Sequence, residues 1–85
     1  MAKIEIYTTL LCPFCVAAKQ LLRRKGARYS ETNVTMNPVA RARMAKRAGG
    51  RRSVPQIFIE GRHIGGCDEL YALDGSGGLD PLLTS

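Results

Sequence analysis

The spacing of hydrophobic residues changes where the chain passes Pro13. Residues 3–7, KIEIY, alternate polar and apolar positions and include β-branched and aromatic side chains, which predicts a strand. After Pro13 the apolar residues recur at the spacing of one helical face, at Phe14, Ala17, Ala18, Leu21 and Leu22. Proline at the first helical position, basic residues near the end and a following Gly26 predict a helix that begins at residue 13.

A second strand and a second helix follow with a weaker pattern. Residues 28–34 favour a strand that is more polar than expected for a central one. Asn37 and Pro38 are a cap and a first helical residue, and Gly49-Gly50 is a terminator. These signals predict a helix with apolar residues at Val39, Ala40, Met44, Ala45 and Ala48.

The remaining segments complete an α/β order. Residues 56–59 and 62–64 flank Glu60-Gly61, which predicts a tight hairpin. A short helix over residues 68–73 and a capped final turn over residues 80–83 follow. The order β-α-β-α-β-β-α requires a parallel pair joined by a crossover helix, and a hairpin that adds antiparallel strands. We therefore expect an α/β protein, a three-layer α/β/α sandwich with a mixed four-stranded sheet.

Composition limits this picture to one small folded domain. The 85 residues are 45% hydrophobic and 24% charged, which is ordinary for a globular protein. A chain of this size builds one core, so we expect a single domain over residues 1–85. Glu5 would interrupt an apolar signal core, and no apolar stretch approaches membrane-spanning length. A cytoplasmic monomer without a membrane partner is predicted.

The net charge of +6 is concentrated in one run. Such a run can bind phosphates, but no aromatic platform and no helix-turn-helix or RNA-binding signature accompanies it. A solvated helix face is therefore favoured and no nucleic-acid partner is expected. An intermediate alternative is a positive field that attracts anionic small molecules or acidic partner proteins. The run contains Arg41, Arg43, Lys46, Arg47, Arg51 and Arg52.

Two cysteines lie at the predicted strand-to-helix junction, in the segment LLCPFCVAAKQLL. Cys12 falls at the expected N-cap, where unpaired N–H groups and the helix macrodipole stabilise an anion. We predict that the pKa of Cys12 lies well below the free-thiol value of about 8.5, which makes Cys12 a nucleophile. Cys15, one turn further in, is expected to be more buried and suited to attack a mixed disulfide at Cys12. Pro13 fixes the entry into the helix, and Phe14 supplies an apolar surface beside the thiols.

A zinc site and a structural disulfide are the alternatives to a redox centre. Three cysteines are too few, and odd in number, for a secreted disulfide framework, and reducing cytosol would not maintain a purely structural bridge. Zinc needs four ligands, and Cys67 and His63 are the only other candidates. Because Cys12 and Cys15 lie at a helix start, redox chemistry is favoured and no metal is expected. His63 is then an ordinary strand-end side chain and Cys67 a small buried hydrophobe.

Three segments, CPFC, SVPQIFI and GGCDEL, resemble those of the dithiol glutaredoxins, and the last twenty or so residues are similar to the bacterial glutaredoxin 3 type. The resemblance implies the thioredoxin fold and a glutathione-dependent oxidoreductase that reduces protein disulfides and glutathionylated mixed disulfides. Cys12 would attack the disulfide or receive glutathione, and Cys15 would resolve the mixed disulfide. Glutathione is then the co-substrate, and the partners are disulfide-bearing or glutathionylated proteins, of which ribonucleotide reductase is a familiar family example.

The resemblance also implies glutathione contacts before the predicted hairpin. Val54 and Pro55 match an element whose proline is cis and whose valine offers its backbone N–H and C=O to the ligand. Without the resemblance a trans bond would be expected, since only about 5–6% of X-Pro bonds are cis. Arg51 and Arg52 are expected near the glycyl carboxylate of glutathione, with simple solvation as the alternative.

The loop after the hairpin matches the family segment that binds the γ-glutamyl end of glutathione. It contains Gly65, Gly66, Cys67 and Asp68. Glycines permit close approach of the backbone, a helix N-terminus offers N–H groups to a carboxylate, and Asp68 can pair with the ligand's ammonium. The alternative for Asp68 is a plain helix cap, and the two roles can coexist.

Three residues depart from the family pattern. Phe14 replaces the tyrosine of Cys-Pro-Tyr-Cys, Ser53 replaces the usual threonine, and Thr9 lies where many relatives have a lysine. Without this lysine, one positive charge that would contact the thiolate or glutathione is missing. Lys19 or residues 51–52 could supply that charge instead.

Two rival functions remain at this point. Some family members carry iron–sulfur clusters, chiefly those with a single-cysteine motif, and Cys15 and Pro13 argue against that role. Thioredoxin-like electron transfer without glutathione is disfavoured because the Trp-Cys-Gly-Pro-Cys signature is missing and the chain has no tryptophan.

Overall fold

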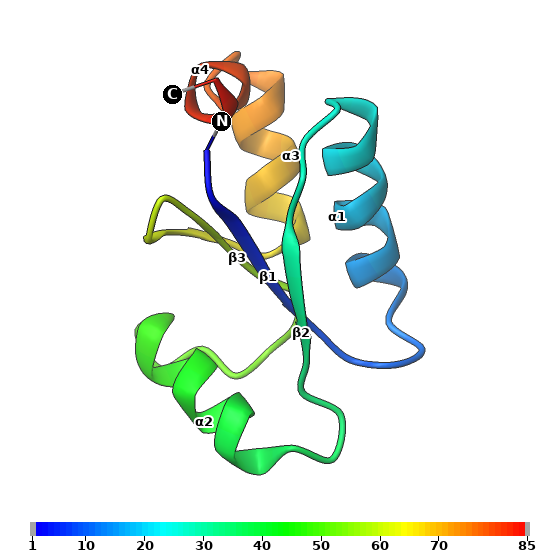
Figure 1. The fold of residues 1–85 in the computed structure, drawn as a ribbon, viewed down its shortest axis with the longest axis vertical. Coiled ribbons are helices and arrows are strands. Elements are labelled where there is room, and N and C mark those ends of the chain that lie inside the picture. The colour runs from blue at the N-terminus through cyan, green and yellow to red at the C-terminus, as the bar shows by residue number, and fades with distance from the viewer. Residues whose placement is uncertain (1, 85) are drawn as a thin grey trace.

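A four-stranded mixed sheet forms the centre of the molecule, as the computed structural model, which describes residues 2–84, shows (Figure 1). Its strands are β1 (Ile4–Thr8), β2 (Ser30–Asn33), β3 (Gln56–Ile59) and β4 (Arg62–Gly65). Their order across the sheet is β2-β1-β3-β4; β1 and β2 are parallel, and the other two pairings are antiparallel. The predicted α/β class and mixed four-stranded sheet are confirmed.

Helices cover both faces of the sheet. Figure 1 shows α1 and α3 side by side on one side and α2 apart from them on the other. The helices are α1 (Pro13–Arg24), α2 (Pro38–Arg47), α3 (Cys67–Gly75) and α4 (Leu79–Leu83). The predicted helix ends are confirmed. Asn37 caps the start of α2, where its Oδ1 accepts the Ala40 N–H at 3.1 Å, and Gly26 follows the end of α1 with a φ of +70°.

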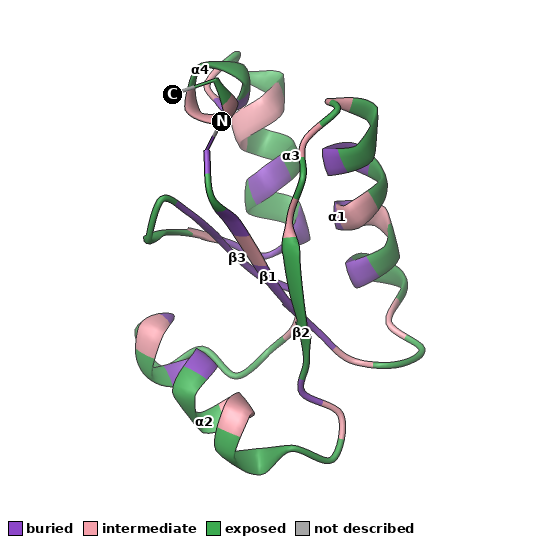
Figure 2. Cartoon of the chain, in the orientation of Figure 1, coloured by how far each residue is buried: buried purple, intermediate pink, exposed green. Residues whose placement is uncertain are grey.

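The side chains of β1 alternate between two cores, because successive residues of a strand point to opposite faces of the sheet. Ile4 and Ile6 pack against the side covered by α1 and α3, together with Ala18, Leu21, Leu22, Ile57, Ile59 and Leu70. Tyr7 faces the α2 side, together with Val34, Met44, Ala48 and Phe58. The buried central strands and the exposed edge strand β2 are visible in Figure 2. The polar pattern of residues 28–34 is therefore explained by an edge position.

Two apolar residues do not belong to the buried faces predicted for them. Val39 is 68% exposed, because it lies in the first turn of α2 on the side away from the sheet. Phe14 is 62% exposed, and Cys15 takes the buried position in the first turn of α1. The third helix also begins one residue earlier and ends two residues later than expected, at Cys67 and Gly75.

Arg47 is an exception to the predicted solvated basic face. Its guanidinium bonds both carboxylate oxygens of Glu5, at 3.0 and 3.1 Å, and the Tyr7 hydroxyl at 2.9 Å. It also lies 4.1 Å from the centre of the Phe58 ring. The bidentate pair raises the pKa of Arg47 and lowers the pKa of Glu5. Arg47 thus fastens α2 to β1.

No helix within residues 2–84 has the length and apolar character needed to cross a membrane.

Candidate active site

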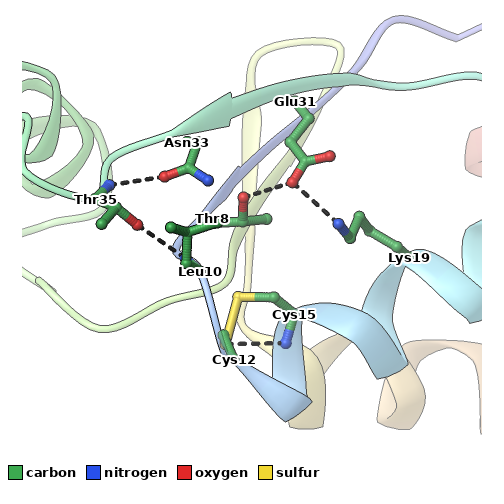
Figure 3. A network of polar contacts seen from close by, with 8 residues as sticks. All are labelled: Thr8, Leu10, Cys12, Cys15, Lys19, Glu31, Asn33 and Thr35. Carbon is green, nitrogen blue, oxygen red and sulfur yellow. Dashed lines mark hydrogen bonds and ion pairs between the residues drawn. A yellow bond between two sulfur atoms is a disulfide. The ribbon is translucent and has the colours of Figure 1, made fainter.

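Cys12 and Cys15 form a disulfide across the first turn of α1, with their Cα atoms 5.2 Å apart (Figure 3). Cys12 has extended backbone angles and is the N-cap of the helix, and the Cys15 N–H donates to its sulfur at 3.1 Å. Cys12 is partly exposed and Cys15 is buried. An N–H group aimed at Cys12 Sγ would stabilise a thiolate after reduction, which supports the predicted low pKa.

The loop before Cys12 is tied to the loop after β2 (Figure 3). The Leu10 N–H donates to Thr35 Oγ1 at 2.8 Å, and the Thr35 N–H donates to Asn33 Oδ1 at 2.8 Å. Leu11, next to Cys12, has a φ of +54° and a fully exposed side chain. These bonds hold the approach to Cys12 against the parallel edge of the sheet.

The segment before β3 lies beside the disulfide. The Val54-Pro55 peptide bond is cis, so the prediction that rested on the resemblance is confirmed. The carbonyl oxygen of Val54 lies 4.0 Å from Cys12 Sγ. Gln56 is fully buried, and its Nε2 donates to the Ser53 carbonyl at 3.0 Å and lies 3.3 Å from Ser53 Oγ. The carbonyl group of Val54 therefore faces the redox sulfur.

A cavity of about 140 Å³ opens between this segment, the first turn of α1 and the start of α3. Most of the residues that the sequence predicted as glutathione contacts line this cavity. Gly65 and Arg52 do not line it, whereas Ser53 and Glu69 line it although the sequence did not indicate them as glutathione contacts. The lining residues are Phe14, Arg51, Ser53, Val54, Pro55, Gly66, Cys67, Asp68 and Glu69.

Glu69 joins two of the segments that line the cavity. Its Oε1 accepts the Gly66 N–H at 2.6 Å and pairs with Arg51 Nη1 at 3.2 Å. The Gly66 hydrogen bond, followed by Arg51, lowers the pKa of Glu69. Glutamate at the third position of a helix is a capping signal in the sequence, so this residue could have been found there.

The two glycines before α3 allow three segments to meet. A Cβ at Gly66 would lie 3.2 Å from the Pro55 carbonyl oxygen, and a Cβ at Gly65 would lie 2.7 Å from Glu69 Oε1. Gly65 also has a φ of +121°, in the region that favours glycine. The start of α3 can therefore approach the cis-proline segment closely.

Cys67 lines the same cavity as a free, buried thiol. Burial, followed by the charges of Asp68 and Glu69, raises the pKa of Cys67. The expectation of a buried side chain is confirmed, and its thiol is the protonated form at neutral pH.

Lys19 is engaged away from the cavity. Its Nζ pairs with Glu31 Oε2 at 3.0 Å, and the same oxygen accepts the Thr8 hydroxyl at 2.6 Å (Figure 3). The Thr8 hydrogen bond, together with Lys19, lowers the pKa of Glu31. Lys19 therefore fastens α1 to β2. Of the basic residues expected to compensate for the lysine that Thr9 replaces, only Arg51 lines the cavity.

The zinc alternative needs Cys12, Cys15, His63 and Cys67 in one place. Within residues 2–84, no group of three or more His, Cys, Asp or Glu side chains is arranged to hold a metal ion. His63 Nε2 lies 2.7 Å from Gln56 Oε1, and its ring packs on Phe58. The side chain therefore has a structural position on the α2 side of the sheet.

Comparison with known proteins gives consistent matches, and the relatives named here match nearly the whole chain. The family model described as glutaredoxin matches residues 4–64. Probable glutaredoxin ssr2061 of Synechocystis is 60% identical over 84 residues, which covers 99% of this chain and 96% of the relative. Glutaredoxin 3 of Escherichia coli K12 is 57% identical over 83 residues, which covers 98% and 99%.

Two solved structures show the same arrangement of elements. The crystal structure of the buckwheat glutaredoxin–glutathione complex matches with a TM-score of 0.89 and 31% identity, covering 98% of this chain and 77% of that one. The solution structure of glutaredoxin from Brucella melitensis matches with a TM-score of 0.85 and 51% identity, covering 98% and 89%.

Proposed function

The chain belongs to the glutaredoxin family, and we propose that Cys12 is its nucleophile and Cys15 its resolving thiol. It is a glutathione-dependent thiol–disulfide oxidoreductase with the thioredoxin fold, and the Cys12–Cys15 pair is its dithiol. The observation that carries the assignment of roles is the Cys15 N–H aimed at Cys12 Sγ at the start of α1. This hydrogen bond would stabilise negative charge on Cys12 once the disulfide is reduced, whereas Cys15 is buried.

The proposed reaction has two exchange steps on the protein. The Cys12 thiolate attacks one sulfur of a substrate disulfide, forms a mixed disulfide, and releases the other substrate sulfur as a thiolate. The Cys15 thiolate then attacks Cys12 Sγ and releases the second substrate thiolate. The product is the Cys12–Cys15 disulfide of the present structure.

Two molecules of glutathione restore the dithiol. The first attacks Cys12 Sγ, which breaks the Cys12–Cys15 bond and leaves glutathionylated Cys12. The second attacks the glutathione sulfur of that mixed disulfide, which yields glutathione disulfide and the Cys12 thiolate. When the substrate is glutathionylated, the Cys12 thiolate attacks its glutathione sulfur, releases the substrate thiolate and becomes glutathionylated. Glutathione then completes the cycle as above, so Cys12 alone suffices for this substrate. Glutaredoxins have reduction potentials of about −200 to −230 mV, a range that allows exchange with a cellular glutathione pool.

The cavity beside Cys12 is the proposed glutathione site. Backbone groups of Val54, next to Pro55, would pair with the ligand backbone, because the Val54 carbonyl already faces the sulfur that glutathione must reach. The γ-glutamyl carboxylate would bind the N–H groups of Cys67 and Asp68 at the start of α3. Gly66, whose own N–H bonds Glu69, would allow the ligand a close approach. Phe14 would cover the apolar side. The buckwheat structure is described as a glutathione complex, which supports this ligand.

The basic residues next to this segment complete the proposed site. Arg51 lines the cavity, and in this proposal it would meet the glycyl carboxylate of glutathione. Arg52 is exposed and precedes Ser53, which lines the cavity, so its proposed contribution is a positive charge near the cavity entrance.

The wider setting is also part of the proposal. Residues 1–85 would act as a single glutaredoxin domain, and a monomeric, cytoplasmic protein would reduce disulfide-bearing and glutathionylated proteins. Ribonucleotide reductase is one proposed protein substrate. Neither a nucleic acid nor a membrane is part of the proposed activity.

Two single variants test the assignment of roles. We expect Cys12→Ser to lose both deglutathionylation of a mixed disulfide and reduction of a protein disulfide. We expect Cys15→Ser to keep deglutathionylation and lose protein-disulfide reduction, since that substrate needs a second thiol. Equal loss of both activities in Cys15→Ser would contradict the separation of nucleophile and resolving thiol. Cys67→Ser is the matched control and should keep both activities, because the proposed contact of Cys67 is made by its backbone N–H, which the substitution retains.

A further inference from the structure

The entire net positive charge of the protein lies in residues 32–59. This segment contains six of the 13 Lys and Arg residues and none of the seven Asp and Glu residues. The remaining residues carry equal numbers of basic and acidic side chains, so their formal charge sums to zero. The segment runs from the edge strand through α2 to β3, and its basic residues cluster on α2 and in the segment before the cis-proline.

Internal ion pairs account for two of these six charges. Arg47 is paired with Glu5, and Arg51 with Glu69. The other four have no acidic partner anywhere in residues 2–84, and we refer to them together as the basic face. The basic face consists of Arg41, Arg43, Lys46 and Arg52.

Two residues of the basic face, Arg41 and Arg52, are joined to the segment beside Cys12. Arg41 donates from Nε and Nη2 to the Arg52 carbonyl, at 3.0 and 2.9 Å. Arg52 is followed by Ser53 and by Val54, whose carbonyl lies 4.0 Å from Cys12 Sγ. Arg43 and Lys46 are three residues apart and therefore share the outward side of α2. A molecule that approaches Cys12 from the α2 side meets this positive charge.

Four exposed apolar side chains, which we call the apolar rim, belong to segments next to the disulfide and at the start of α2. Leu11 and Met36 are fully exposed, and Phe14 and Val39 are more than half exposed. They come from the loop before Cys12, the first turn of α1, the loop after β2 and the first turn of α2. The Leu10–Thr35 hydrogen bond holds two of these segments together. Apolar side chains next to positive charge suit a protein segment better than a nucleic-acid backbone, because apolar side chains can pack against a protein but cannot bind phosphates.

We propose that the basic face selects protein disulfides that are flanked by acidic residues. The proposal rests on the proposed function, since it concerns the substrate whose disulfide Cys12 attacks. Opposite charge on the substrate increases the rate of encounter and orients the disulfide toward the sulfur, and salt screens this effect. The chemical exchange at Cys12 and Cys15 is the same for every substrate.

The test compares two synthetic peptides with the same central disulfide, one flanked by glutamates and the other by lysines. With the wild-type protein and glutathione at low salt, we expect kcat/KM to be about tenfold higher for the glutamate peptide. The variant with Arg43→Glu and Lys46→Glu should remove or reverse this preference. A control variant with Arg23→Glu and Arg24→Glu makes the same change of net charge on exposed residues of α1, and it should retain most of the preference. At about 0.5 M salt the two peptides should become equivalent.

Each outcome bears on the proposal. Equal rates for the two peptides in the wild type, or equal loss of preference in both charge variants, would overturn it. Salt-dependent binding of a DNA duplex that disappears in the α2 variant, without any peptide preference, would assign the basic face to nucleic acid instead. Deglutathionylation of a small neutral substrate should be unchanged in both variants, and circular dichroism should show that both are folded. Failure of the wild type to reduce either peptide would count against the proposed function, whereas loss of preference alone counts only against this inference.

Discussion

The buried amide of Gln56 holds the carbonyl oxygen of Ser53 at 3.0 Å. Because a carbonyl only accepts hydrogen bonds, this contact fixes Nε2 toward Ser53 and Oε1 toward His63. His63 Nε2 lies 2.7 Å from that oxygen, so it is the protonated ring nitrogen. Burial, followed by the charge of Arg51, lowers the pKa of His63, and its ring packs 5.1 Å from that of Phe58. The segment that faces Cys12 is therefore held from the interior of the sheet.

Replacement of Gln56 by leucine should impair glutathione binding through this contact. We expect Gln56→Leu to lower the free energy of unfolding by about 1–3 kcal/mol, since the Ser53 carbonyl loses its donor and His63 Nε2 loses its acceptor. The KM for glutathione should increase more than kcat decreases, because Ser53 and Val54 lose their support. Urea unfolding and steady-state kinetics measure the two effects. Gln20→Leu, on the exposed side of α1, is the control, and an unchanged KM in Gln56→Leu would contradict the positioning role.

The ion pair between Glu5 and Arg47 predicts a pH-dependent contribution to stability. Arg47 lowers the pKa of Glu5, so the contribution is complete above the unfolded glutamate pKa and is lost as the pH falls through the lower folded value. Glu5→Gln should cost about 1–3 kcal/mol near pH 7, as expected for a charged hydrogen bond. The difference from wild type should shrink in strong acid, once the pH lies below the lowered folded pKa of Glu5 and the carboxyl is protonated in both states. A difference of the same size at both pH values would show that the ion pair is not its source.

Gly65 and Gly61 offer a matched test of close approach at the active site. Both have positive φ, +121° and +79°, but only at Gly65 would a Cβ collide, at 2.7 Å from Glu69 Oε1. Gly61→Ala should cost about 1 kcal/mol from backbone strain alone. Gly65→Ala should cost more and should also raise the KM for glutathione, because Glu69 and the start of α3 must move. Equal stability and equal KM in the two variants would show that the close approach of Gly65 to Glu69 affects neither stability nor glutathione binding.

Cys67 should react slowly even though it lines the cavity. Its pKa is raised by burial and by Asp68 and Glu69, so little thiolate is present near pH 7. In the reduced protein, iodoacetamide should modify Cys12 at least about 100-fold faster than Cys67, as measured by mass spectrometry of the peptides. Unfolding in urea is the control, since it should bring the two rates close together. Modification of Cys67 at the rate of Cys12 in the folded protein would contradict the assignment of a buried, protonated thiol.

Local sequence signals were sufficient wherever the deciding interactions lie within a few residues. Pro13 and Gly26 bound α1, Asn37 caps α2, and Glu60-Gly61 forms the turn of the hairpin, as predicted. The placement of Cys12 at a helix N-cap follows from the same local rules, so the pair of cysteines could be identified as a redox centre before the fold was known. The errors at Phe14 and Val39 occur in first helical turns, where an apolar residue can face solvent or a cavity without breaking the helical pattern.

The sequence by itself determined the elements, their order and the two thiols, because hydrophobic period, capping and turn formation act over short stretches of chain. Only the tertiary structure decided what those elements face. The antiparallel register that sets Tyr7 opposite Gln56 brings the segment before β3 to the end of β1, and so places Val54 beside Cys12, 42 residues away. The same packing turned Arg47 from one charge of a basic run into a partner of Glu5. A hydrophobic period shows that a face is buried, but its partner is set by strand register and by the packing of distant segments.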